Sequence, residues 1–242
     1  MAVLPSEYLR VRQQQAQEEH QDKNMSIQTI IDNATYLEIN KRKVAASTVS
    51  RSGHLKTADR GVGIYSFRVG MHNALKYSTN RSLLESLDTM DVINEANISL
   101  NNNSNMQYLT NYQGNISPAQ LDNITMVGSN GANLYINCSG ATGAGVLFKA
   151  GDFIQPKGNT STYRYPYQVT SDVAWSVSAD ITVPVHRGVL SQTGTSITTG
   201  GLRVGKNVNW QVKALQMPVY SVVPHDRIEF SGDFQLMEVI TD

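Results

Sequence analysis

Three runs of sequence decide the fold class of this chain: GVLFKAGDFIQP (residues 145–156), YRYPYQVT (163–170) and WSVSADITV (175–183). Apolar residues alternate with small or polar ones along them, and Gly, Pro, Asn and Ser bound them. Such alternation is typical of half-buried antiparallel strands. The stretch therefore predicts a β-meander with one face against a hydrophobic core.

Further strands are predicted on both sides of this stretch. Alternating or apolar runs at residues 95–100, 106–112, 133–138, 207–215 and 227–240 favour short strands. Leu83, Leu84, Leu87 and Met90 share one face of an amphipathic helix over residues 80–90, which opens on a capping-box spacing. We expect a mainly β fold, an antiparallel sandwich or split barrel with one or two flanking helices.

The N-terminal region differs in character. Residues 6–23 have high helix propensity but almost no apolar stripe, whereas residues 25–36 are apolar and fit either a helix or the lead into a strand. We therefore expect an N-terminal helical extension over residues 1–36 and a single β domain over residues 37–242.

Composition excludes several classes of protein. The 242 residues carry no formal net charge, which gives no global electrostatic argument for binding nucleic acid or a membrane surface. No run reaches the roughly 18 apolar residues that span a bilayer. Cys138 is the only cysteine, and the first 24 residues lack the apolar segment of a secretory signal. We expect a protein made in a reducing cytosol, with no membrane partner.

The sequence offers no convincing catalytic or cofactor motif. The glycines of residues 140–145 do not have phosphate-loop or dinucleotide spacing, and a strand follows them where such motifs require a helix. The five histidines are isolated, and Cys138 lies within an expected strand, where a buried structural thiol is typical. We expect neither an enzyme nor a bound cofactor or metal.

A long hairpin over residues 37–68 is the most unusual feature. Two extended runs flank Arg51-Ser52-Gly53, where Gly supplies the positive φ that hairpin turns need. A strand of fourteen residues would be about 45 Å long, more than the sheet of a small domain requires. Because its tip holds few apolar residues, we expect the hairpin to pack on another chain. The expected inter-subunit contacts are Lys41, Arg42, Lys43, Val44, Val49, Arg51, His54, Lys56 and Arg60.

The basic character of this hairpin has two interpretations. It could be a nucleic-acid arm, although no aromatic residues are interleaved with its basic residues and it has no zinc or helix-turn-helix signature. Alternatively, it is a charged edge that prevents wrong strand pairing and meets an acidic patch on a partner. The C-terminal carboxylates could form such a patch; these are Asp226, Glu229, Asp233, Glu238 and Asp242.

The middle and end of the chain resemble the tail and baseplate proteins of tailed bacteriophages. The resemblance rests on LFKAGDFIQ (147–155) followed by YPYQVTSDV (165–173), and on FSGDFQLME (230–238) after Met217-Pro218. Upstream, the basic hairpin and the helix after it are similar to the tail-tube superfamily. Together these features cover most of residues 37–240, and residues 6–23 have no counterpart in the pattern.

The resemblance implies a structural subunit of a tail tube or baseplate, of the distal-tail or tube-initiator type. Such subunits form a ring, here expected to be hexameric, by head-to-tail contacts that pair open sheet edges. DNA would pass through the channel as non-specific cargo, and the other partners would be tail or baseplate proteins. The expected location is the virion tail, after synthesis in the host cytoplasm.

One alternative of a different class remains open. The Tyr-rich segment Tyr163–Tyr167 could stack on a sugar ring, as in a carbohydrate- or receptor-binding virion module.

Overall fold

The chain folds around two hydrophobic cores, each enclosed by antiparallel β-sheet. The computed structural model describes residues 27–42, 45–59, 63–71, 75–88, 95–156, 165–176, 181–190 and 200–240. The helix expected over residues 6–23 lies outside these ranges. Most described elements are strands, which confirms the mainly β fold that the alternation predicted.

A five-stranded sheet forms one side of the first core. Its strand order is β1 (Ala34–Arg42), β4 (Ile64–Met71), β18 (Phe234–Glu238), β15 (Trp210–Gln216) and β6 (Ala96–Ile98). The last strand of the chain thus lies in the middle of the sheet, between β4 and β15. The C-terminal region is tied into the sheet, as expected from its apolar pattern.

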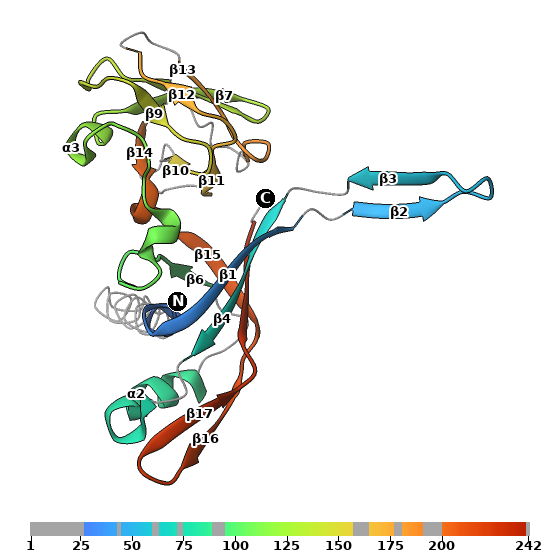
Figure 1. Ribbon diagram of the computed structural model, residues 1–242, viewed down its shortest axis with the longest axis vertical. Coiled ribbons are helices and arrows are strands. Elements are labelled where there is room, and N and C mark those ends of the chain that lie inside the picture. Colours follow the sequence, from blue (N-terminus) through green and yellow to red (C-terminus); the bar gives the residue numbers. More distant parts are fainter. Residues whose placement is uncertain are drawn as a thin grey trace, which may run out of the picture.

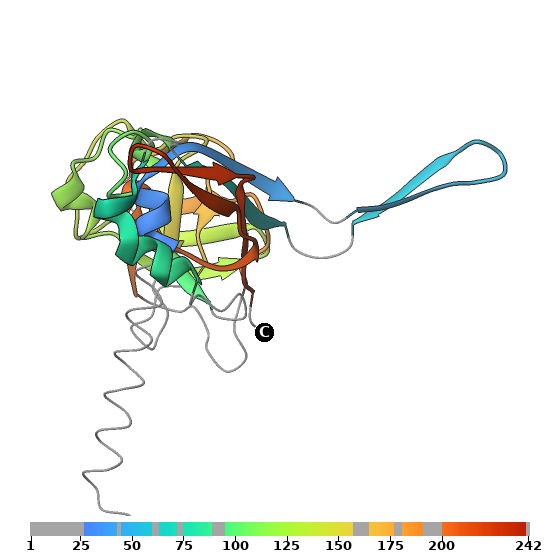
Figure 2. The same cartoon turned by 90° about the horizontal axis from the view of Figure 1, so that it is seen from below.

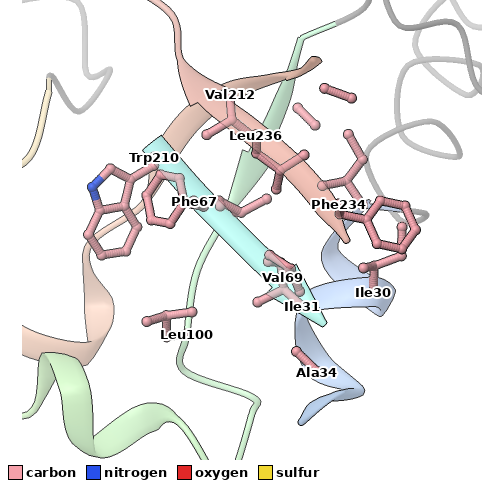
Figure 3. Packing of buried hydrophobic residues seen from close by; sticks show 14 of the residues in the cluster. Ile30, Ile31, Ala34, Phe67, Val69, Leu100, Trp210, Val212, Phe234 and Leu236 are labelled. Carbon is pink, nitrogen blue, oxygen red and sulfur yellow. The ribbon is translucent and has the colours of Figure 1, made fainter. Parts of the chain in front are cut away.

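Residues 27–32 form a helix that packs on this sheet, and the chain then continues directly into β1. Ile27, Ile30 and Ile31 are almost fully buried, beside Val69 and Phe234 (Figure 3). The segment is therefore helix and then strand, the two interpretations that its sequence left open. The boundary expected at residue 36 has to move: residues 27–36 belong to the first core because their isoleucines help to build it.

Helix α2 (Tyr77–Asp88) covers the same core with Leu83, Leu84 and Leu87, as its amphipathic pattern predicted. It packs beside a three-stranded sheet of β16 (Val219–Val223), β17 (Arg227–Ser231) and β5 (Leu75–Lys76). This group lies at the lower end of the molecule in Figure 1.

The second core comes from the segment inserted between β6 and β15. Its sheet has the order β11 (Tyr167–Gln168), β10 (Phe153–Pro156), β14 (Gly200–Val204), β7 (Thr125–Asn130), β8 (Asn133–Asn137) and β13 (Ile181–Pro184). A two-stranded sheet, β12 (Val173–Ala174) and β9 (Val146–Phe148), lies beside it. The short helices are η1 (Gln107–Thr110), α3 (Pro118–Leu121) and η2 (Gly205–Asn207).

The six-stranded sheet curls until its two edges meet at one point. Val169, just after β11, forms an isolated antiparallel bridge with Val185, just after β13. Two backbone hydrogen bonds reinforce this seam: His186 N–H donates to Gln168 O (2.9 Å) and Thr170 N–H donates to Pro184 O (3.0 Å). The arrangement agrees with the expected split barrel, and none of the sheets among the described residues closes completely.

Two expectations about local structure are wrong in part or in whole. Residues 145–184 form only part of the expected meander: β10 pairs with the next strand, β11, but β10 also pairs with β14 and β13 pairs with β8, both outside this stretch. Residues 106–112 are not a strand but contain η1, whose alternation reflects a single buried side chain, Thr110. Alternation identified buried positions correctly in the first case, but it could not identify the pairing partners.

The hairpin expected over residues 37–68 is present and has two parts. Its base is β1 paired with β4, from Leu37 opposite Val69 to Arg42 opposite Ile64. Its outer part is β2 (Ala45–Val49) paired with β3 (Leu55–Asp59), which we call the arm (residues 45–59). The arm projects away from both cores (Figures 1 and 2), and Gly53 at its tip has a φ of +79°, as the turn requires.

A buried ion pair joins the two cores. Arg187 follows the seam of the six-stranded sheet, and Glu238 ends β18 of the five-stranded sheet. Their side chains are 2% and 0% exposed. Both Arg187 Nη1–H and Nη2–H donate to the Glu238 carboxylate, each at 2.7 Å, in the bidentate geometry that makes such pairs strong.

Both partners of this pair make further hydrogen bonds. Arg187 donates to the carbonyl oxygens of Gly63 (2.8 Å) and Pro166 (3.0 Å), and Tyr65 N–H donates to Glu238 (3.0 Å). Burial lowers the pKa of Arg187, but the hydrogen bonds and charge of Glu238 outweigh it and raise that pKa above its ordinary value. The guanidinium also lies over three tyrosine rings, 5.3–5.9 Å from their centres: Tyr65, Tyr165 and Tyr167.

Removing one partner of this pair should destabilise the whole protein. We expect Glu238→Gln to lower the free energy of unfolding by about 3–5 kcal/mol, because it leaves the Arg187 charge buried without a counter-ion. Urea denaturation measures this change. The control is Asp233→Asn, which breaks the exposed pair with Arg68 (2.6 Å) and should cost at most about 1 kcal/mol. Equal losses in the two variants would contradict a joint held by this ion pair.

A second stability prediction concerns His186, next to Arg187. Burial, together with the positive charges of Arg187 and Lys41, lowers the pKa of His186 from 6.5 to about 3. His186 therefore becomes protonated near pH 6.5 in the unfolded chain, but only near pH 3 in the folded chain. Stability from this residue is present above pH 6.5 and is lost as the pH falls, with a slope that approaches about 1.4 kcal/mol per pH unit.

The variant His186→Asn should remove most of this slope between pH 6 and 5. Its amide oxygen can accept the bond that Gln168 N–H donates to His186 Nδ1 (3.0 Å), but it does not titrate. Urea midpoints of the two proteins at pH 7, 6 and 5 make the comparison. If the urea midpoints of the two proteins fell equally with pH, His186 would not be neutral in the folded chain.

Candidate assembly surface

The arm exposes apolar side chains that the rest of the described chain does not cover. Val49 and Leu55 lie directly opposite each other next to the tip, and they are 66% and 67% exposed. An isolated two-stranded hairpin is only marginally stable in water, because it lacks a core of its own. The arm is therefore the part of the structure with most to gain from contact with another chain.

The turn at the end of the arm is well defined. Gly53 N–H donates to Ser50 O (2.9 Å), Ser50 N–H donates to His54 O (2.9 Å), and His54 N–H donates to Ser50 Oγ (3.1 Å). Arg51 and His54 are exposed beside the apolar pair. The tip thus presents a fixed loop with one permanent positive charge and two apolar side chains.

The nine expected contact residues fall into three groups. Val49, Arg51 and His54 lie at the tip, and Lys56 lies in β3, opposite Thr48. Lys41 lies at the base, where its Nζ donates to Gln168 Oε1 of the second core and where burial lowers its pKa. Arg42 ends β1, and the other three are outside the described residues: Lys43, Val44 and Arg60.

Leu55 is a residue that the sequence analysis missed. The turn signal at Gly53 was recognised, but the tip was expected to hold few apolar residues, and Leu55 was not among the expected contacts. Counting back from this turn pairs Leu55 with Val49 and so predicts the apolar pair. Lys41, by contrast, was among the expected contacts, but it is hydrogen-bonded within its own chain and is a weaker candidate for a partner contact.

Three of the five C-terminal carboxylates expected to form the receptor for the arm have partners within their own chain; of the other two, Glu229 is exposed in β17 and Asp242 lies outside the described residues. Glu238 is buried with Arg187, and Asp233 pairs with Arg68. Asp226 accepts hydrogen bonds from the backbone N–H (2.8 Å) and hydroxyl of Ser78 at the start of α2, which lower its pKa. Each of these three carboxylates has a partner within its own chain, so they do not combine into one acidic surface.

The outer face of the five-stranded sheet is open next to the base of the arm. A hollow of about 210 Å³ lies over β1, β4, β18 and the end of β15. Its lining mixes charged, polar and apolar side chains, among them Glu38, Arg68, Leu215, Gln235 and Met237. Leu215 is 58% exposed there. Edge strand β1 borders this face and, within the described ranges, pairs only with β4.

Two of the three tyrosines proposed as an alternative sugar platform are not available for stacking. Tyr165 is 6% and Tyr167 0% exposed, since both pack around Arg187. Tyr167 Oη also accepts a hydrogen bond from Leu190 N–H (2.9 Å). Tyr163 lies outside the described residues. The carbohydrate-binding alternative therefore loses two of its three tyrosines.

Nothing in the described part of the chain forms a recognisable reactive centre. Burial raises the pKa of the Cys138 thiol to about 11, which disfavours the reactive thiolate. The described residues contain no group of three His, Cys, Asp or Glu side chains placed to hold a metal ion. A second cavity, of about 300 Å³, lies between α3 and β14; among its lining residues are Tyr112, Asp122, Arg203 and Lys206.

Fold and surface together define a mainly β protein with two cores, open sheet edges and a projecting arm. The sequence matches no protein-family model, and comparison with curated proteins gave no significant match. No helix among the residues described is long and apolar enough to cross a membrane.

The apolar tip should be dispensable for the stability of the single chain. We expect the double variant Val49→Ser, Leu55→Ser to change the free energy of unfolding by no more than about 0.5 kcal/mol, because neither side chain is buried. Urea denaturation of dilute protein tests this. Phe67→Ala, in the first core, is the positive control and should cost about 3–5 kcal/mol. A large loss in the tip variant would mean that the arm packs on its own chain.

Proposed function

We propose that the protein is a structural subunit of a bacteriophage tail tube or baseplate that assembles into a ring through its arm. The observation that carries the proposal is the arm itself: two paired strands of five residues each that project from the body and end in an exposed apolar pair. Ordering such an element without covering it gives little stability to the single chain.

The open sheet edges support the same conclusion. β1 lies at one edge of its sheet and runs into the arm, so a neighbouring copy that covers the arm also comes close to this edge. Pairing of open edges by identical neighbours is a recognised way to remove unpaired backbone groups. A contact between the arm of one copy and a different surface of the next is heterologous, and such contacts close into rings.

The resemblance of residues 147–155, 165–173 and 230–238 to tail and baseplate proteins adds the class of assembly. It favours a ring of six copies around a DNA channel, with other tail or baseplate proteins above and below. The neutral formal charge of the chain suits a wall along which DNA slides without tight binding. The site of action would be the virion tail, after assembly in the host cytoplasm.

The decisive experiment removes the arm at a point that the register defines. Arg42 and Ile64 are directly paired, so a two-residue Asn-Gly turn can join them in place of residues 43–63. We expect this variant to remain folded but to form no rings, because the apolar tip is lost. Light scattering and negative-stain electron microscopy compare it with the full chain.

The tip variant Val49→Ser, Leu55→Ser keeps the arm but should need at least a tenfold higher protein concentration to assemble in the same assay. Rings that form normally without the arm would refute its role in assembly. A full-length chain that remains monomeric at every concentration, alone and with tail proteins, would refute the ring.

A further inference from the structure

Strand β16 is an open edge of unusual composition. Among the described residues it pairs only with β17, and Figure 1 places it at the end of the molecule opposite the second core. Val219 and Val222 are 74% and 52% exposed. No charged residue occurs from Met217 to Pro224.

This edge lacks the charged residues that edge strand β1 carries. Edge strands usually carry charges that discourage pairing with other chains, and β1 does so with Glu38, Lys41 and Arg42. The sequence of β16, VYSVV, instead combines high strand propensity with no charge. Such an edge is a template for pairing with another strand.

We propose that β16 pairs antiparallel with β16 of a second copy about a two-fold axis through Ser221. This register opposes Ser221 to Ser221 of the second copy, Tyr220 to Val222, and Val219 to Val223. Each directly opposed pair then consists of two apolar side chains, except for the pair of Ser221 hydroxyl groups at the axis. The two copies contribute the same residues to the contact. An isologous contact requires this kind of self-complementarity.

The two faces of the joined sheet support this register. Tyr220 lies opposite Phe230, and Val222 lies opposite Ile228, in β17. Directly paired side chains share a face. The contact would therefore create an apolar row of Phe230 and Tyr220 from one copy and Val222 and Ile228 from the second copy. The two-fold axis generates an identical row. Ile228 belongs to the first core and is fully buried. Val222 is exposed because the sheet stops at β16.

The charged residues of β17 stay apart in this arrangement. Glu229 lies opposite Ser221, so the two Glu229 side chains would be separated by three strand spacings, about 14 Å. Repulsion between them is screened at that distance. β2 of the arm, with the sequence AASTV, is also free of charge and is an alternative partner for β16. In that pairing, Ala45 and Ala46 would take the positions opposite β16 that Val219 and Tyr220 of the second copy take in the self-pairing. It would therefore bury less apolar surface.

Cysteine cross-linking tests the register directly. Ser221→Cys places two thiols opposite each other on the proposed axis, at a separation that a disulfide can span. The only native cysteine, Cys138, is fully buried. In a glutathione redox buffer, we expect more than half of the Ser221→Cys protein to run as a disulfide-linked dimer on a non-reducing gel.

Ser231→Cys is the matched control. Ser231 is equally exposed and lies in the neighbouring strand, far from its symmetry mate, so it should cross-link at least tenfold less. Adding Val222→Lys to Ser221→Cys should abolish the cross-link, because it inserts a charge into the apolar row. Circular dichroism checks that this variant stays folded.

The remaining outcomes each decide the question. A Ser221→Cys protein that stays monomeric, or a control that cross-links equally, overturns the proposal. A mixture of Ser221→Cys and Ser47→Cys proteins that forms mainly the mixed disulfide assigns the edge to the arm and also overturns it. The arm-less chain should still give the Ser221 cross-link, so failure of the ring and failure of this contact are distinguishable.

Discussion

The bidentate ion pair between Arg187 and Glu238 is the interaction on which the rest of the structure depends. It is the point at which a strand end of one core and a sheet seam of the other are bonded to each other. Taking two charges out of water is expensive, and here the cost is offset by two short hydrogen bonds between them and further bonds to backbone groups. Because each bond has a required geometry, the pair fixes the orientation of the two cores as well as holding them together.

The neighbours of this pair explain why that orientation is rigid. Gln155 of β10 and Asn209 beside β15 exchange two hydrogen bonds (2.8 and 2.9 Å), which form a second polar tie between the cores. Phe153, also in β10, packs edge-on against Trp210 in the first core (5.4 Å between ring centres). The joint thus combines polar specificity with aromatic packing.

How far the sequence predicts this structure depends on the range of the interactions. The hairpin and its turn at Gly53, the buried leucines of α2 and the strand at residues 133–137 follow from local pattern, and they were predicted. The prediction of a meander was incomplete. It could not include the pairing of β10 with β14, because these strands are about fifty residues apart in the sequence and no local signal specifies their pairing. Glu238 was assigned to an acidic surface because its strand alternates normally. Only the tertiary structure reveals Arg187 as its partner.

The two proposed contacts have different symmetry, and this limits how they can act together. The arm contact is heterologous, so it repeats in one direction and closes into a ring with two unlike faces. The contact through β16 is isologous, so it turns one copy over relative to the other. A ring that used both would pair with a second ring face to face and form a closed, finite particle. A tube that continues in one direction cannot contain such a pair. If the protein acts in a tail as proposed, the contact through β16 therefore suits the free protein before assembly, when mutual coverage keeps an uncharged strand from pairing with other chains.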